Sequence, residues 1–450
     1  MSRIRIIITI IVVVLTTLLT GCTGKEPNEI AYVVALGIDS TDDDNYKITI
    51  QYANTTQISG GASESGGKAG SEIVDNVTIE APNIYAGVGL ANNIVSKSFS
   101  MSHAKLIVFS KEIAEKGVKD MIETLVRSEE IRPDVFIAVA NTTANDYLTS
   151  VNPEMEVNPA QYYQLIYQKN QLVGIPDGQL REFFTGLYTD NYDSILPVAG
   201  VIEGSGSNRQ NDDKGQSKDG QNEGSEGSSE SLDSFESKSS DDKDENEKEK
   251  DAEKNTSKYE YDIKNYVGGE TAIEKKNKAE AIGAAVFEKD KMVGELGEVE
   301  TEICKMLKGD YTYSYLTYYN NDTPDIPITV KTTQQKKPKY KIDTDKKTVD
   351  IELYIESDLY SLPADYNVEN KIEDFERDVA NYTSSACTEF INNFTKKYNS
   401  DILKLNEKVK YKFLTNNQYN WFKKNVGWSE YKFSVCTNFK VRRTGLIVRE

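Results

Sequence analysis

One stretch of the chain, residues 204–258, lacks the means to fold and therefore divides the rest into two candidate folded parts. Between Asp212 and Lys254 it holds 16 acidic and 7 basic residues, and Leu232 and Phe235 are its only large apolar side chains. So little apolar area cannot offset the entropy lost when a backbone is ordered. We predict a disordered acidic linker at residues 204–258, acting as a solvated spacer; an acidic interaction segment would have the same composition.

The acidic linker also explains much of the charge of the chain. The 450 residues carry a formal net charge of -19, and the stretch from Asp212 to Lys254 supplies nine of those charges. Nucleic acid and anionic lipid headgroups would be repelled by the chain as a whole, so neither is an expected partner for it. The folded parts are only mildly acidic.

The N-terminal residues have the layout of an export signal. Arg3 and Arg5 precede an apolar run at residues 6–19 that only threonines interrupt, and small residues follow it. An uncleaved membrane helix is the alternative, but a span needs about 20 apolar residues, more than this run provides. The arginines place the N-terminus on the cytoplasmic side, so the remaining chain is expected outside.

The residues that close this run are Leu19, Thr20, Gly21 and Cys22. They resemble the bacterial lipobox, in which an aliphatic residue, a small residue and Gly or Ala precede a cysteine. The resemblance implies that residues 1–21 are a removed signal peptide and that the Cys22 sulfur receives a diacylglyceryl group. Acyl chains contribute about 0.8 kcal/mol for each buried methylene, and two chains suffice for stable anchoring.

Residues 22–203 are predicted to form an N-terminal α/β domain, because strand and helix patterns alternate along them. The residues that join its first two strands, Asp42 to Asn45, lack the spacing of an EF-hand, so we interpret them as a solvated turn. The strands are expected at 31–38, 46–52, 73–79, 106–109, 135–140 and 195–198, and the helices at 84–95, 118–125, 162–167 and 180–187.

Residues 259–450 are predicted to form a C-terminal α+β domain that could divide into subdomains at 259–335 and 336–450. Gly309 is the expected cap of its first helix, and Cys436 is expected to face away from the buried side of the last strand. The elements are a hairpin at 282–287 and 292–296, a helix at 299–306, a strand at 349–355, a long helix at 372–394, helices within 402–422 and a strand at 431–441. The whole chain is thus expected to be a multi-domain α+β protein, with mixed sheets covered by helices and the C-terminal sheet packed on the long helix.

The sequence offers little for catalysis or metal binding. His103 is the only histidine, which leaves a Ser-His-Asp triad one candidate and a zinc site too few ligands. Cys304, Cys387 and Cys436 lack CxxC spacing, so we expect free thiols and at most one disulfide. We expect no enzyme, metal or cofactor. A glycosidase is the alternative that the abundant acidic residues leave open, and it would need two carboxylates at a defined distance from each other.

Six segments carry a resemblance to a known family. They run from Asn28 to Ala31, Leu36 to Asp39, Ser102 to Lys105, Ala284 to Phe287 with Met292 to Gly294, Lys397 to Ile402, and Lys440 to Ile447. In this order, after a lipobox, they resemble the spore germination lipoproteins of the Ger(x)C family, which are the C subunits of GerA-type nutrient germinant receptors. The resemblance extends from the lipobox nearly to the last residue and leaves out the acidic linker.

The resemblance implies a binding and assembly subunit in spore germination. Such a subunit is anchored through Cys22 on the outer face of the spore inner membrane, beside the integral membrane A and B subunits. A solute-binding lipoprotein of an importer is the alternative, and it would need two similar lobes with a ligand cleft between them. Trp421 and Trp428 could report ligand binding by fluorescence. Arg442 and Arg443 are interpreted as a solvated strand end, with a headgroup or partner contact as the alternative.

Overall fold

The computed structural model describes most of the two predicted folded parts. It covers residues 3–10, 29–43, 45–53, 74–152, 158–168, 174–189, 191–202, 265–271, 277–319, 327–361, 371–398 and 400–444. Residues 3–10 are helical, and within the covered residues we find no helix with the length and apolar content needed to span a bilayer. The residues from Leu19 to Cys22 and the acidic linker lie outside the described residues.

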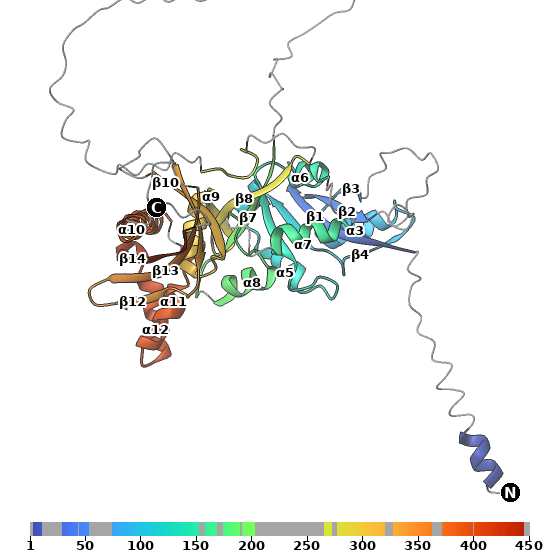
Figure 1. The fold of residues 1–450 in the computed structure, drawn as a ribbon. Coiled ribbons are helices and arrows are strands. Elements are labelled where there is room, and N and C mark those ends of the chain that lie inside the picture. The colour runs from blue at the N-terminus through green and yellow to red at the C-terminus, as the bar shows by residue number, and fades with distance from the viewer. Residues whose placement is uncertain are drawn as a thin grey trace, which may run out of the picture. The chain divides into compact units, whose positions relative to one another are not determined.

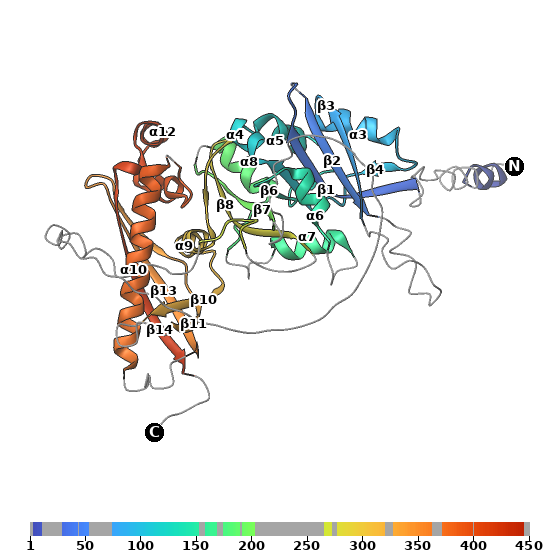
Figure 2. The same ribbon diagram turned by 90° about the horizontal axis from the view of Figure 1, so that it is seen from above.

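The first sheet has nine strands and mixes parallel and antiparallel pairs (Figures 1 and 2). Its central strands β1, β5, β6 and β7 are parallel to one another, and the order across the sheet is β3-β2-β1-β5-β6-β7-β8-β9, with β4 beside the start of β1. The strands are β1 (Ile30–Ser40), β2 (Tyr46–Ala53), β3 (Val74–Ala81), β4 (Ser98–Ser100), β5 (Leu106–Ser110), β6 (Phe136–Ala140), β7 (Ile195–Val201), β8 (Ala279–Glu288) and β9 (Lys291–Leu296).

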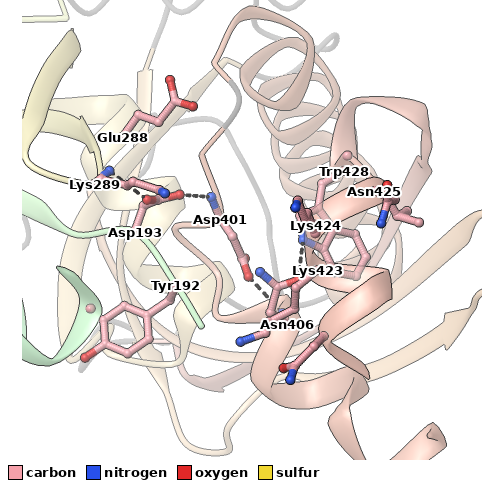
Figure 3. Close-up of a pocket in the computed structure, with 14 residues that line it drawn as sticks. Tyr192, Asp193, Glu288, Lys289, Asp401, Asn406, Lys423, Lys424, Asn425 and Trp428 are labelled. Carbon is pink, nitrogen blue, oxygen red and sulfur yellow. Dashed lines mark hydrogen bonds between the residues drawn. The ribbon is translucent and has the colours of Figure 1, made fainter. Parts of the chain in front are cut away.

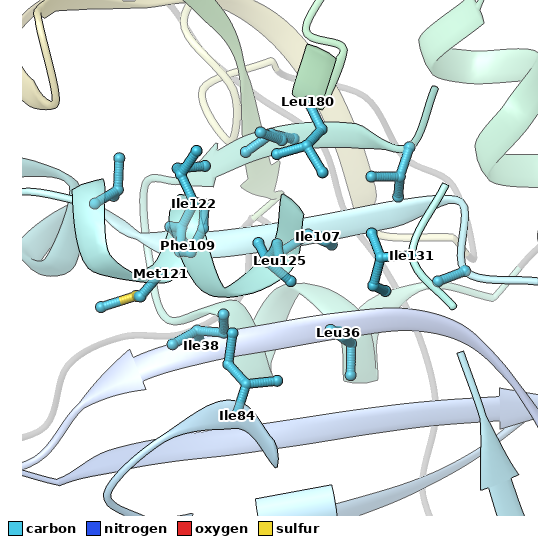
Figure 4. Packing of buried hydrophobic residues seen from close by; sticks show 14 of the residues in the cluster. Leu36, Ile38, Ile84, Ile107, Phe109, Met121, Ile122, Leu125, Ile131 and Leu180 are labelled. Carbon is cyan, nitrogen blue, oxygen red and sulfur yellow. The ribbon is translucent and has the colours of Figure 1, made fainter. Parts of the chain in front are cut away.

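Helices cover both faces of this sheet. One face packs against α3 (Ile84–Asn92), α4 (Lys111–Lys116), α5 (Lys119–Val126) and α8 (Leu180–Thr189), and the other against α6 (Ala144–Ser150) and α7 (Pro159–Gln168). Figure 4 shows the first of these two cores. Every residue of β5 and β6 is buried, as expected for strands covered on both faces.

The β8–β9 hairpin is predicted correctly as a hairpin, and it belongs to the first sheet. β8 pairs with β7 in antiparallel fashion, although the acidic linker separates these two strands in sequence. The first sheet therefore continues past residue 259, where the sequence pattern predicts a domain boundary. The fold class is confirmed, because two mixed sheets with covering helices make an α+β protein.

The second sheet is organised around β13 (Thr348–Ser361). The strand pairs with β11 and β12 along different halves of one edge, and with β14 in parallel along the other. Its residues alternate between buried and partly exposed, as predicted. The other strands are β10 (Tyr313–Tyr319), β11 (Pro327–Gln334), β12 (Lys339–Asp343) and β14 (Lys432–Arg443). Cys436 is exposed on β14, again as predicted, whereas Cys304 and Cys387 are buried free thiols.

Four α-helices and two 3-10 helices accompany this sheet in the described chain. The long helix α10 (Ile372–Lys397) runs along β13 and β14 (Figure 2). Gly309 ends α9 (Glu298–Lys308) with φ 84°, in the left-handed conformation that the sequence predicts for this cap. The remaining elements are α11 (Leu405–Val409), η2 (Lys410–Lys412), α12 (Asn416–Asn425) and η3 (Trp428–Glu430).

Helix α10 covers the outer edge of β14 with polar side chains. Asn392 accepts from the Phe433 N–H at 3.1 Å and donates to the Phe433 carbonyl at 2.9 Å. At steps of four or eight residues along the same helix, Thr388, Ser384 and Glu376 accept from the N–H groups of Val435, Thr437 and Val441. An uncovered strand edge invites pairing with other chains, so these bonds protect β14 as well as stabilise it.

We predict that Asn392→Ala destabilises the protein by about 1–3 kcal/mol, because it leaves both polar groups of Phe433 without their partner. The neighbouring Asn393 is exposed, so Asn393→Ala makes the same chemical change without that loss. Urea unfolding of the two variants and the wild type measures the difference. Equal unfolding free energies for the two variants would show that the edge contacts contribute nothing.

Candidate functional site: the joint at Asp193 and Asp401

A cleft of about 750 Å³ lies where the C-terminal helices meet the first sheet (Figure 3). Three parts of the chain line it. The connection from α8 to β7 contributes Tyr192 and Asp193, and the β8–β9 turn contributes Glu288 and Lys289. The segment from Asp401 to Trp428 forms the opposite wall. We refer to the contacts around Asp193 and Asp401 at this cleft as the joint.

Asp193 forms hydrogen bonds both to the β8–β9 turn and to the segment that begins at Asp401. One carboxylate oxygen accepts from the Lys289 N–H at 3.0 Å, and the other accepts from the Asp401 N–H at 2.8 Å. The Asp193 N–H in turn donates to the Asp401 carbonyl at 3.1 Å. The Ser400 hydroxyl donates to the Phe287 carbonyl at 3.1 Å, so residues 400 and 401 are attached to the first sheet through backbone and side-chain bonds.

Asp401 starts the C-terminal helices. Its carboxylate accepts from the N–H groups of Leu405 and Asn406, both at 2.8 Å. These are donors at the beginning of α11 that have no partner within the helix. One aspartate therefore orients α11, and through its own backbone holds that helix against Asp193.

Lysines complete the joint. Lys404 forms an ion pair with Glu182 of α8 at 2.6 Å, and its ammonium lies 4.3 Å from the centre of the Tyr192 ring. Lys423 of α12 donates to the Thr189 carbonyl at 3.3 Å and to the Asn191 side chain at 3.2 Å. Each lysine thus reaches from a C-terminal element to the connection between α8 and β7.

Burial shapes the protonation of the two aspartates. It raises the pKa of Asp401 to about 7, against the two backbone N–H donors that favour the charged carboxylate. Burial also raises the pKa of Asp193, again opposed by its backbone donors. The negative charge of Asp193 also raises the pKa of Asp401, and that of Glu288 raises the pKa of Asp193.

This burial makes the stability of the joint depend on pH. The pKa of Asp401 is higher in the folded chain, about 7, than its ordinary value of 3.8, so between these values the folded chain holds a proton that the unfolded chain has lost. Stability from this group is therefore greatest below the ordinary value and falls as pH rises through the window. We predict that Asp401→Asn removes this part of the slope, measured as unfolding free energy against pH; an unchanged slope would contradict the assignment.

The cleft has a composition suited to holding parts of the chain together. The carboxylates of buried Asp401 and partly buried Asp193 accept from backbone N–H groups, and Lys423 donates to Thr189 and Asn191. Among the residues that the structure describes, no three His, Cys, Asp or Glu side chains are grouped as a metal site would require. Chemically, the arrangement positions the start of α11 against the first sheet.

The residues singled out by sequence lie apart from the joint or outside the described chain. The lipobox, Leu19 to Cys22, is outside it and stays a prediction. His103 is exposed and makes an edge contact with the Tyr32 ring, the centroids 4.8 Å apart. Arg442 donates to Glu356 on β13 and is exposed at the end of β14, as expected for a solvated strand end that also forms a surface ion pair.

No sequence pattern assigns a role to Asp193, and Asp401 stands out only within a segment of family resemblance. Asp39, in another such segment, has a similar task, since its carboxylate accepts from the Ala144 and Asn145 N–H groups at the start of α6. The two aspartates share one feature in the sequence: each is an acidic residue within a segment of resemblance. The partners, far away in sequence, could not be foreseen.

The fold and the joint together define a two-sheet α+β protein whose halves are attached through a polar, helix-capping contact. Residues 24–201 match the family model described as "Spore germination protein N-terminal domain", and residues 282–445 match "Spore germination B3/ GerAC like, C-terminal". The chain belongs to the Ger(x)C family of spore germination proteins, as the sequence predicts.

Relatives from Bacillus subtilis (strain 168) share moderate identity with parts of the chain. Spore germination protein KC is 26% identical over 176 residues, which are 36% of this chain and 43% of that protein. Putative spore germination protein YfkR is 28% identical over 145 residues, 32% of this chain and 37% of that protein. The matches thus span less than half the length of these relatives. The crystal structure of the GerBC protein matches 90% of this chain and 96% of its own, with a TM-score of 0.48 and 15% identity.

Proposed function

We propose that this chain is a lipid-anchored, non-catalytic subunit of a nutrient germinant receptor that acts in spore germination. In this proposal, diacylglyceryl on Cys22 holds it on the outer face of the spore inner membrane, where it assembles with integral membrane A and B subunits. The observation that carries the proposal is the family match over both folded parts. Curated relatives named as spore germination proteins support the same role.

Anchoring serves an assembly role because it confines the chain to the plane in which its partners lie. Two acyl chains hold a protein stably at a bilayer, and confinement raises the effective concentration of partners for each other. The joint supports this role in a second way. It attaches α11 and α12 to the first sheet, so that a partner bound at one part of the chain can act on the other.

A catalytic role has weak support in the described chain. His103 is exposed beside Tyr32 and far in sequence from the joint. The acidic side chains at the cleft are used as helix caps and backbone acceptors, as Asp193 and Asp401 show. Nucleophilic catalysis needs a nucleophile in contact with a base, whereas Asp193 and Asp401 accept from backbone N–H groups.

The solute-binding alternative has one observation in its favour, the cleft of about 750 Å³ with Trp428 in its wall. Two similar lobes are its other requirement, and here the two sheets differ. One has nine strands around a parallel centre, and the other has five strands around β13. We therefore place the importer role second.

Deletion of the gene tests the proposed function. We expect spores without this chain to lose the response to at least one nutrient, and a complemented strain to regain it, because the remaining subunits lack a partner. Cell-wall and peptide hydrolysis should be unchanged. Normal germination in every nutrient tested, or turnover of such substrates by the purified protein, would overturn the proposal.

A further inference from the structure

The segment that links α11 to α12, together with the outer side of α12, exposes apolar side chains to an unusual extent. Tyr411 is 92% exposed, Leu414 is 95% exposed and Trp421 is 64% exposed. Most large apolar side chains in a folded domain are at least partly covered, and a group of exposed ones marks an interaction surface. We call these three residues, with Lys410, Lys412 and Lys424, the tip patch; Lys424 is exposed and also lines the cleft at the joint.

The exposed side chains of the tip patch are not needed to fold the segment. Inward-facing aromatic residues pack this segment instead. The ring centroid of Phe413 lies 5.9 Å from that of Tyr419 and 5.0 Å from that of Phe422, and the Phe422 and Trp428 centroids are 5.9 Å apart. Tyr419 and Phe422 are buried in the core that the second sheet forms with its helices. The outward residues are therefore available for another partner.

The tip patch is also positively charged in a chain with a net charge of -19. Lys410, Lys412 and Lys424 are exposed, and no ion pair to any of them is found in the described part of the chain. The pKa of Asp343 is lowered mainly by the backbone N–H of Lys346, with a smaller contribution from the charge of Lys412. Nearby Lys404 and Lys423, by contrast, are committed to the joint.

We propose that the tip patch docks on an anionic bilayer surface. Trp and Tyr rings prefer the headgroup region, where an apolar body and a polar edge are both satisfied. Lysines beside them are drawn to anionic lipid, and a leucine can enter the acyl boundary. Repulsion of the acidic remainder from the same surface then orients the chain with the tip patch toward the membrane.

This inference rests on the proposed anchoring through Cys22, which brings the chain to a bilayer and leaves its orientation open. A protein partner is the competing occupant of such a surface. The combination found here favours lipid, because the three apolar side chains are each largely exposed, lysines lie close to them in the sequence, and a bilayer can accept them without a shaped pocket. The sequence predicts that the acidic chain as a whole repels anionic headgroups, and the tip patch is a local exception to that prediction.

Trp421 itself reports the contact. The lipidated full chain is reconstituted on vesicles of neutral phosphatidylcholine, or of phosphatidylcholine with phosphatidylglycerol, both containing a lipid brominated in the acyl chain. We expect Trp421 fluorescence to fall to about half on the anionic vesicles and to become less accessible to acrylamide. High salt should reverse the effect, because screening weakens attraction between exposed charges. A Trp421→Phe chain supplies the signal of Trp428, which is 7% exposed.

Two matched double variants distinguish membrane contact by the tip patch from anchoring through Cys22. Lys410→Glu with Lys412→Glu should abolish the quenching on anionic vesicles, whereas Lys119→Glu with Lys278→Glu, an equal charge change at exposed lysines elsewhere, should not. Unchanged Trp428 emission confirms that each variant is folded. If the protein fails to float with neutral vesicles, the anchor proposal fails. If it floats and Trp421 stays unquenched on anionic vesicles, the tip patch does not dock on lipid. Protection of Trp421 from acrylamide only in native spore membranes would likewise contradict docking on lipid and indicate a protein partner.

Discussion

A chain carrying Cys22→Ala is expected to lose all membrane retention that depends on acyl chains. The thioether that would join diacylglyceryl to the protein needs the Cys22 sulfur, and alanine has none. Without lipidation, the chain should remain uncleaved at residue 21 or be released. Metabolic labelling with a fatty-acid probe measures the modification, and flotation of spore membranes measures the retention.

The exposed Cys436 provides the matched control. It is a free thiol on β14, so Cys436→Ala removes a sulfur without touching the lipobox and should leave labelling and retention as in the wild type. Normal labelling of the Cys22→Ala chain would refute lipidation at this residue. Loss of labelling in the Cys436→Ala chain would show that Cys436, and not Cys22, carries the lipid.

Gly294→Val is expected to prevent stable folding of the junction between the two sheets. A Cβ atom at Gly294 of β9 would lie 2.3 to 2.5 Å from three atoms of the Tyr398 side chain, the hydroxyl oxygen and two ring carbons. Tyr398 is buried and packs against Phe394, with ring centroids 5.2 Å apart, so the ring has little room to move. Overpacking of this kind costs about 1–3 kcal/mol and occasionally more, and valine adds two methyl groups.

Two further variants make the Gly294 prediction specific. A Cβ atom at Gly89 in α3 would meet no neighbouring element of the described chain within 4 Å, and Gly89→Ala should stabilise by up to about 1 kcal/mol through helix propensity. Replacing Tyr398 by alanine should relieve the clash, so the cost of Gly294→Val should be smaller in that background. Additive effects in urea unfolding would show that the two residues do not meet.

Patterns local in sequence predicted most elements of the fold. Alternation of apolar and polar residues indicated β1 with β2, and β13, and the helical period of Phe375, Val379, Tyr382, Phe390 and Phe394 indicated α10, all five being buried. The expected helix at 118–125 is α5, and the short helix α4 before it, ended by Gly117, was missed. Six residues are too few for a periodic pattern to be distinguished from a loop.

Contacts between distant residues could not be predicted. The pairing of β8 with β7 crosses the acidic linker, and no local pattern says which sheet a hairpin will join. The bonds from α10 to β14 depend on a match between four-residue steps of a helix and two-residue steps of a strand. Single Thr, Ser and Asn residues on a helix, such as Thr388 and Asn392, give no sign of that match.

The joint shows the same limit at the candidate site. The sequence marks two segments only by their family resemblance, Met292 to Gly294 and Lys397 to Ile402. In the structure these segments meet where Gly294 lies against Tyr398. The sequence therefore indicated that these segments matter to the family without indicating what they do. Asp193 had no such marker, because a single acidic residue before a strand resembles any solvated turn.

The central claim, that this chain is an assembly subunit, is tested most directly by what accompanies it in the membrane. The lipidated protein would be affinity-purified from detergent-solubilised spore membranes, and the co-purifying proteins identified by mass spectrometry. We predict two integral membrane proteins, the A and B subunits, in stable proportion to the chain, and their loss when Cys22→Ala is purified in the same way. Recovery of the wild-type chain alone, or with the membrane subunits of an importer, would contradict the claim.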